Sequence, residues 1–310
     1  MAITAAMVKE LREMTGVGML DCKKALAETD GDMQKAVELL REKGLAASAK
    51  KAGRIAAEGI VDCKIAADGK SGVVVEVNSE TDFVAKNPTF REYVDQVADQ
   101  ALESNAADID TFLAENWKFD TTVTVAGALS QKVAVIGENL KIRRFEKFTL
   151  DKAGMIVSYI HGGGRIGVMV KLSCDKAVPE IEEMGKNVCM QIAALNPKFV
   201  SDSDVPQDFI DHEKEILIKQ TKEDPKNASK PDNIIEKMIE GRLKKELKEF
   251  CLLDQMYVKD GEMNVAQYVA SVAKATGSAI KVEKFVRFET GEGLEKKQDD
   301  FAKEVTEMSK

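Results

Sequence analysis

Histidine, tryptophan and paired cysteines are scarce in this chain of 310 residues. There are two histidines, one tryptophan and five cysteines, and the cysteines form no C-x-x-C pair. This pattern predicts neither a zinc site nor a disulfide framework. The G-x-S-x-G and H-E-x-x-H patterns of hydrolases are also missing. We therefore expect no catalytic residue, no bound metal and no cofactor.

Long apolar runs and an excess of positive charge are missing too. No stretch approaches the roughly 18 apolar residues that a membrane span needs. The start of the chain lacks the basic and then apolar pattern of a secretory leader, so we expect a cytoplasmic protein without membrane contact. Lys and Arg number 45 against 53 Asp and Glu, giving a net charge of -8. This balance disfavours direct nucleic-acid binding.

The composition is otherwise that of a globular protein, and the length predicts roughly two domains. Residues 1–44 predict three short helices, with Thr4 and Asp32 as caps and with glycines as breaks, Gly44 ending the third. We expect this bundle and a helical linker to form one unit, residues 1–55.

From residue 59 the apolar period becomes that of strands, and one pattern occurs twice. Glycines recur at a shift of 95 positions, in the pairs Gly59 and Gly154, Gly69 and Gly164, Gly72 and Gly167. We predict one hairpin-then-helix unit used twice, in residues 56–150 and 151–289. Two further expected matches are Val97–Ala98 with Ile192–Ala193 in the helices, and Arg144–Glu146 with Arg287–Glu289 in the third strands.

The second unit contains an insertion, about residues 200–250, with two charged amphipathic stretches. Prolines separate the stretches, which predicts a helical hairpin. A last helix is expected at about 294–308. Together these elements predict the α+β class.

Two segments imitate nucleotide-binding motifs. Gly162 to Gly167 reads G-x-G-x-x-G, but a strand rather than a helix follows it, which favours a hairpin turn. Gly69 to Ser71 imitates the end of a P-loop without its first glycine, and is also expected to be a turn. His161, beside the first of these turns, is interpreted as a turn or contact residue rather than as an acid or base.

The connector at residues 78–87 is unusual because it is polar yet carries Phe83 and Val84. On the residues alone, Phe83 either folds back into the core or is exposed for function. In the second unit Pro179 follows almost at once and suits a helix start, so the longer connector is unique to the first unit. A loop found in one copy only is a candidate for function.

Two long segments resemble a known family. Residues 11–26, LREMTGVGMLDCKKAL, and residues 76–87, EVNSETDFVAKN, resemble the two signatures of bacterial elongation factor Ts. Shorter similar segments follow at 136–139, 161–167 and 288–293. The resemblance spans the chain in order. It implies an N-terminal bundle like a ubiquitin-associated domain, a duplicated core, a coiled-coil hairpin and a C-terminal helix module at 290–310.

Members of that family are guanine-nucleotide exchange factors for elongation factor Tu, the GTPase that carries aminoacyl-tRNA, and are not enzymes themselves. The resemblance implies that one segment disturbs the Mg²⁺ site of the GTPase: Thr81, Asp82, Phe83 and Val84. It implies that other positions contact the same partner: Lys9, Arg12, Met19, Leu20, Ile136, Gly137 and His161. A homodimer of heterodimers is left open.

Two other functions remain open on the residues alone. An adaptor that uses the N-terminal bundle predicts binding without any change in the nucleotide kinetics of the partner. An enzyme with His161 and a carboxylate as acid and base predicts turnover of a small molecule by the isolated chain.

Overall fold

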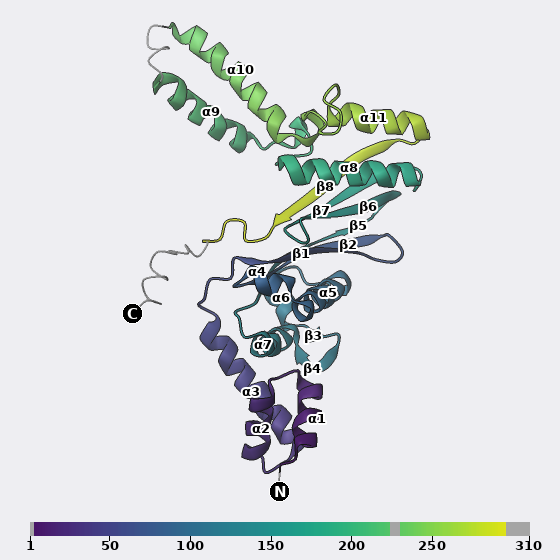
Figure 1. Ribbon diagram of the computed structural model, residues 1–310. Coiled ribbons are helices and arrows are strands. Elements are labelled where there is room, and N and C mark those ends of the chain that lie inside the picture. Colours follow the sequence, from purple (N-terminus) through teal and green to yellow (C-terminus); the bar gives the residue numbers. More distant parts are fainter. Residues whose placement is uncertain (1–2, 224–229, 296–310) are drawn as a thin grey trace.

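The computed structural model describes residues 3–223 and 230–295, and it is layered along one long direction (Figure 1). A helical bundle lies at one end. It is followed by a layer of helices, two stacked sheets, a second layer of helices and a projecting helical hairpin. The mixed α+β class is confirmed. The predicted C-terminal helix lies almost entirely in residues 296–310, outside the described residues.

The helices of the described residues are α1 (Ala5–Thr15), α2 (Met19–Glu28), α3 (Met33–Lys51), α4 (Asp82–Lys86), α5 (Pro88–Glu103), α6 (Ile109–Ala114), α7 (Val125–Ile136), α8 (Pro179–Leu195), α9 (Gln207–Glu223), α10 (Asp232–Phe250) and α11 (Val265–Thr276). The strands are β1 (Glu58–Ile65), β2 (Ser71–Ser79), β3 (Asn116–Trp117), β4 (Asp120–Thr124), β5 (Lys141–Thr149), β6 (Gly154–His161), β7 (Ile166–Cys174) and β8 (Ile280–Glu289).

The caps expected for the N-terminal bundle are present. The Thr4 hydroxyl accepts a hydrogen bond from the Met7 N–H, and the Asp32 carboxylate accepts one from the Lys35 N–H. Gly16 ends α1 with a φ of 67°, in the left-handed region that favours glycine. Buried apolar side chains from all three helices fill the centre of the bundle: Val8, Leu11, Cys22, Ala25, Leu26, Ala36 and Leu40.

The expected end of the third helix at Gly44 is wrong, because α3 continues to Lys51. Gly44 faces α7, where a Cβ on Gly44 would lie 3.5 Å from the Cβ of Ala134, an ordinary contact distance. The residues around Gly44 are mostly good helix formers and offset its low propensity. Arg41 also reaches Asp120, with 3.0 Å between Nη2 and Oδ2. The bundle is therefore packed on the first repeat unit.

The strand order and register of one sheet recur in another, 95 positions later. One sheet has the order β1-β2-β5 and another the order β6-β7-β8, and all pairs are antiparallel. Gly59 pairs with Asn78, and 95 positions later Gly154 pairs with Ser173. The bulges correspond as well, one after Glu76 and one after residue 171. We call residues 56–150 the first copy and residues 151–289 the second copy.

The expected match between the third strands is displaced by three residues. In the sheets Phe145 lies opposite Val75, and Phe285 lies opposite Val170, which is the equivalent position in the second copy. Arg144–Glu146 therefore corresponds to residues 284–286, not to Arg287–Glu289. Each strand has two phenylalanines three residues apart, so the letters align at either one, and only the pairing decides.

The expected match between the helices is also wrong, by one turn. Gln100 in α5 and Gln191 in α8 occupy the same place, at a shift of 91 rather than 95. The Gln100 Oε1 accepts from the Lys118 N–H at 2.8 Å, and the Gln191 Oε1 accepts from the Val258 N–H at 2.9 Å. Both amides are buried, so each pairing satisfies polar groups away from water.

The connectors explain this offset. Residues 80–87, the long connector, join β2 to α5, whereas residues 175–178, the short connector, join β7 to α8. The difference is four residues, about one helical turn. The expected equivalence of Val97–Ala98 and Ile192–Ala193 ignored this difference. The prediction that the second helix starts earlier, at Pro179, is confirmed.

The two sheets stack face to face, and the repeated glycines Gly72 and Gly167 make this close approach possible. A Cβ on Gly72 would lie 2.8 Å from the Met169 Sδ, and a Cβ on Gly167 would lie 2.4 Å from the Val61 Cγ1. Both glycines lie within strands, so they are needed for sheet packing rather than for turns. Buried apolar residues of both copies fill the interface: Val61, Val74, Phe148, Ile156, Met169 and Phe288.

Both segments that imitate nucleotide motifs are hairpin turns, as predicted. Gly162, Gly163 and Gly164 connect β6 to β7 with φ values of 60°, 67° and 108°. Residues 66–70 connect β1 to β2, and Ser71 is already the first residue of β2.

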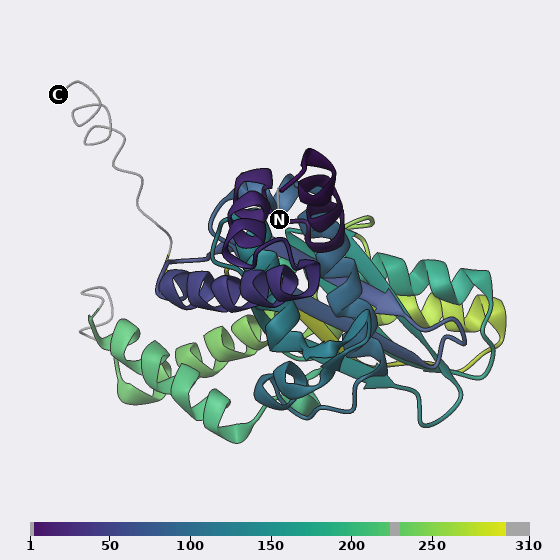
Figure 2. The ribbon, with the colours of Figure 1, turned by 90° about the horizontal axis from the view of Figure 1, so that it is seen from below.

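The insertion forms the expected hairpin, in which α9 and α10 pack side by side and project from the body (Figure 2). Leu217 and Ile239 are buried, one in each helix. The sequence analysis did not predict α6, α11 or the two-stranded β3-β4 sheet.

Candidate functional site

The long connector is an ordered turn of helix, and it exposes one aromatic ring. Thr81 caps α4, since its Oγ1 accepts a hydrogen bond from the Val84 N–H at 3.3 Å. Val84 is buried in the core of the first copy. The side chain of Phe83 is 80% exposed. Of the two alternatives left open for Phe83, packing into the core is therefore wrong, and its neighbour Val84 anchors the connector instead.

A charged pair lies on the exposed side of α4. Lys86 Nζ lies 2.6 Å from Asp82 Oδ2, one helical turn away, and 6.0 Å from the centre of the Phe83 ring. The hydrogen bond from Lys86 lowers the pKa of the Asp82 carboxyl, so Asp82 is ionised at neutral pH. The exposed face of the connector therefore presents a carboxylate beside a large apolar ring.

The segment after α7 holds the long connector in place. Gly137 ends α7 with a φ of 88° and turns the chain toward α4. Glu138 Oε2 accepts the backbone N–H groups of Glu80 at 3.0 Å and of Thr81 at 3.1 Å. Glu138 Oε1 accepts the Thr81 hydroxyl at 2.6 Å. The structure thus brings Ile136 and Gly137 next to the 81–84 segment.

The turn between β6 and β7 of the second copy also lies beside α4. Residues Gly162 to Arg165 share a groove of about 310 Å³ with Asp82 and Lys86. Arg91 of α5 spans it and donates to the Gly163 carbonyl at 3.0 Å. His161, the last residue of β6, is exposed and directly precedes this turn.

His161 has a hydroxyl neighbour. Its Nδ1 lies 3.0 Å from the Tyr159 hydroxyl. In the described parts of the chain no group of three or more His, Cys, Asp or Glu side chains is placed to hold a metal ion. None of the helices in those parts is long and apolar enough to cross a membrane.

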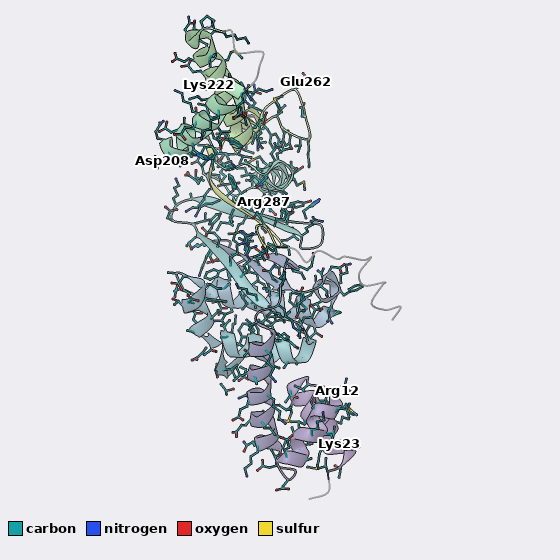
Figure 3. The ribbon with its side chains drawn as sticks, turned by 90° about the vertical axis from the view of Figure 1, so that its left-hand side faces the viewer. Arg12, Lys23, Asp208, Lys222, Glu262 and Arg287 are labelled. Atoms are coloured by element: carbon teal, nitrogen blue, oxygen red, sulfur yellow. The ribbon has the colours of Figure 1, made fainter. Side chains whose placement is uncertain are left out.

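The four N-terminal positions are all exposed on the bundle. Leu20 is 74% exposed and Met19 is 51% exposed, although both are large and apolar. Lys9 and Arg12 are exposed on α1, and Lys9 lies 3.7 Å from Glu13. Figure 3 shows Arg12 at the bundle end of the molecule, far from Asp208 and Lys222 at the hairpin end. The structure does not bring these positions to the connector.

Comparison with known proteins decides the family. The model of the family described as Elongation factor TS matches residues 80–292. The chain is 54% identical to Elongation factor Ts of Clostridium perfringens strain 13, and 52% identical to that of Clostridioides difficile strain 630, with 99% of each chain covered. It is 51% identical to Elongation factor Ts of Trichlorobacter lovleyi, with 98% of each chain covered. The chain belongs to the elongation factor Ts family.

Membership in the elongation factor Ts family supports a role in translation elongation. The matched residues begin in the long connector and extend to Glu292, so they contain Phe83, Glu138 and His161 but not the N-terminal bundle.

Sequence reasoning did not identify Glu80 and Glu138 as the residues that hold the connector. They are 58 positions apart, and no local pattern links them. The signals present were that Glu80 lies in the similar segment 76–87 and that Glu138 lies in the similar segment 136–139, directly after Ile136 and Gly137.

Proposed function

We propose that this chain is a guanine-nucleotide exchange factor for elongation factor Tu, and that it acts in the cytoplasm by binding the GDP form of that GTPase. The segment from Thr81 to Val84 disturbs the Mg²⁺ site of the partner. GDP is held by contacts to its phosphates and by the Mg²⁺ that bridges the phosphate oxygens. Disturbing the metal therefore weakens the binding of GDP.

One observation carries the proposal: the exposed Phe83 ring on an anchored connector. A large apolar side chain in solvent contributes little to its own fold, and aromatic anchors are typical of binding hot spots. Val84 and Glu138 fix the connector from two sides, so little order is lost when the ring enters a partner pocket.

The energetics require more than one contact. Weakening GDP by about 10⁴ requires a preference of about 5.5 kcal/mol for the nucleotide-free partner. Burying one Phe side chain supplies roughly 1.5–3 kcal/mol. We therefore assign additional contacts to a second set of residues, namely Lys9, Arg12, Met19, Leu20, Ile136, Gly137 and His161. By thermodynamic linkage, bound nucleotide weakens the affinity of this chain for the GTPase by the same factor, so the binding of GTP releases the chain.

The test is the release of fluorescent GDP from the cognate GTPase, followed by stopped flow. The wild-type chain should accelerate release, and Phe83→Ala should slow the accelerated rate about 30-fold, equivalent to about 2 kcal/mol. Phe119→Ala is the matched control, because Phe119 is also exposed but lies between β3 and β4 against Trp117. It should leave release unchanged.

Two results would contradict the proposal. Tight binding of the chain without any acceleration of GDP release indicates an adaptor. A Phe83→Ala variant that melts several degrees lower yet accelerates release normally would mean that the ring serves the fold.

A further inference from the structure

The internal repeat provides a comparison for Glu138. Gly137 and Gly277 end α7 and α11, both in the left-handed region, so Glu138 corresponds to Ser278. By the 95-residue shift of the strands, Glu80 of the first copy corresponds to Asp175 of the second copy. Both copies therefore carry a polar pair where the connector leaves the sheet.

The two pairs make the same reciprocal hydrogen bonds. In the second copy the Asp175 N–H donates to the Ser278 Oγ at 3.0 Å, and the Ala279 N–H donates to the Asp175 Oδ2 at 2.8 Å. In the first copy the Glu80 N–H donates to Glu138, and the Asn139 N–H donates to the Glu80 Oε1 at 2.5 Å. Both copies share this reciprocal pair of hydrogen bonds, and in the first copy longer side chains make it.

The added length gives Glu138 two hydrogen bonds that Ser278 does not have. A serine oxygen ends one bond from Cβ, whereas the Glu138 carboxylate extends to the Thr81 N–H and the Thr81 hydroxyl. That hydroxyl at the same time accepts from the Val84 N–H and so caps α4. The extra bonds are made only in the copy whose connector has four more residues and exposes Phe83.

We propose that Glu138 is a positioning residue: its carboxylate fixes Thr81, the cap of α4, and thereby holds Phe83 in the orientation in which the ring enters the partner. The inference rests on the proposed exchange function. Hydrogen bonds to a charged acceptor are the strong ones, and three of them converge on one side chain here. A connector ordered beforehand loses less conformational freedom on binding.

The first measurement uses no partner. Amide hydrogen exchange of the free protein should show faster exchange at residues 80–84 in Glu138→Ser, which installs the residue of the second copy. Glu138→Gln keeps the length and one of the two acceptor oxygens but loses the charge, so its exchange should lie between wild type and Glu138→Ser. Equal protection in wild type and Glu138→Ser would overturn the inference, whatever the chain does to nucleotide release.

The second measurement is release of fluorescent GDP from the GTPase. Glu138→Ser should slow accelerated release about tenfold, the equivalent of one charge-assisted hydrogen bond, and Glu138→Gln, which keeps the length without the charge, should restore part of the rate. Ser278→Ala removes the equivalent acceptor in the second copy and should leave the rate unchanged.

A double-variant cycle separates positioning from a general structural role. When Phe83 is already alanine, Glu138→Ser should slow release less than about twofold further, because the orientation of the ring no longer matters. A full tenfold loss in the Phe83→Ala background, or equal losses for Glu138→Gln and Glu138→Ser, would overturn the inference. If the wild-type chain fails to accelerate release at all, the exchange function itself fails, and the amide measurement still decides whether Glu138 orders the connector.

Discussion

The first and second copies share strand order, pairing and bulges, and they diverge where the middle strand leaves the sheet. In the first copy eight residues, 80–87, precede the helix, and in the second copy four residues, 175–178, do so. The helix behind the sheet keeps its place, since Gln100 and Gln191 make the same backbone contacts. One copy of a duplicated scaffold can thus gain a loop with an exposed ring while its sheet and helix stay fixed.

The most demanding test of this asymmetry is to remove the 81–84 segment and offer it again in the other copy. Replacing Thr81–Val84 by alternating glycine and serine should slow accelerated GDP release about 100-fold or more, because both the ring and its anchor are lost. Binding to the GTPase, measured by calorimetry, should weaken much less, because the other proposed contacts remain.

Placing Thr-Asp-Phe-Val at residues 176–179 of that variant should not restore release. The turn at 162–165 before β7 lies beside Asp82, so residue 174, at the far end of β7, points the short connector to another side. The new segment would also replace Pro179 at the first turn of α8. Recovery of rapid release would show that the copies are interchangeable.

Local pattern was sufficient to predict the repeat, the hairpins, several helix caps and the difference between the connectors. Strand pairing in hairpins is local, and the glycines mark it in both copies. The helix offset follows from the same difference, since Pro88 and Pro179 at the starts of α5 and α8 are 91 positions apart, and the expected match at 95 positions did not take it into account. The helix continues through Gly44 because its neighbours are mostly good helix formers, and its packing on α7 is a contact distant in sequence.

The candidate site was predicted in part. The segment from Thr81 to Val84 was identified, but pattern alone could not decide whether Phe83 or Val84 faces the core. Burial decides it, since the neighbours of Val84 come from several elements of the first copy. The hold of Glu138 on the connector is a long-range hydrogen-bond network, and a single sequence contains no period or spacing that marks it.

Substitution of the two glycines in the sheet interface should have a smaller effect, on the stability of the fold. It tests whether the two copies tolerate added volume at this interface equally. A methyl group on Gly167 would meet the stiff, branched Val61 at 2.4 Å. One on Gly72 would meet the flexible Met169 side chain at 2.8 Å and the branched Ile156 at 3.0 Å, a contact that a shift of a few tenths of an ångström relieves. Gly167→Ala should therefore lower the free energy of unfolding by about 2 kcal/mol. Gly72→Ala should cost about 1 kcal/mol or less, because alanine also restricts the unfolded chain.

Urea unfolding measures both glycine variants. As a control, the double variant Val61→Ala, Gly167→Ala should lose less unfolding free energy than the two single variants lose together. The smaller side chain at residue 61 makes room for the methyl group at residue 167. Equal losses of unfolding free energy for Gly72→Ala and Gly167→Ala would mean that the residues on both sides of the interface adjust to a methyl group equally well.

A reversal of charge distinguishes the copies at the bulge. Glu76 of β2 is fully buried and accepts hydrogen bonds from the Arg144 Nε at 2.6 Å and the Gly291 N–H at 2.8 Å. The equivalent residue of β7, Lys171, donates to the exposed Asp151 at 2.6 Å. The first copy thus holds the chain after β8 through a buried carboxylate, and the second copy makes a surface ion pair.

Burial raises the pKa of the Glu76 carboxyl, but hydrogen bonds from Gly291, Asn78 and Arg143 and the charge of Arg144 together lower it further, so the pKa lies below its ordinary value of 4.5. The folded protein therefore holds this proton less tightly than the unfolded chain. The stability that the carboxylate contributes is complete above about pH 4.5 and is lost as the pH falls through the lower value of the folded state.

The smallest predicted effect is the pH dependence that follows from this shift. Glu76→Gln should be less stable than wild type above about pH 5, and the gap should narrow as the pH falls below about 4.5, because only the wild type loses the contribution of a carboxylate. Urea unfolding at a series of pH values measures the gap. Lys171→Gln is the control. Its stability difference from wild type depends on a surface ion pair, so it should be small and should fade in about 0.5 M salt. The buried ion pairs of Glu76 are screened much less. A Glu76→Gln gap that stays constant down to about pH 3 would mean that Glu76 binds its proton equally in both states, and the contrast between the copies at this position would not be electrostatic.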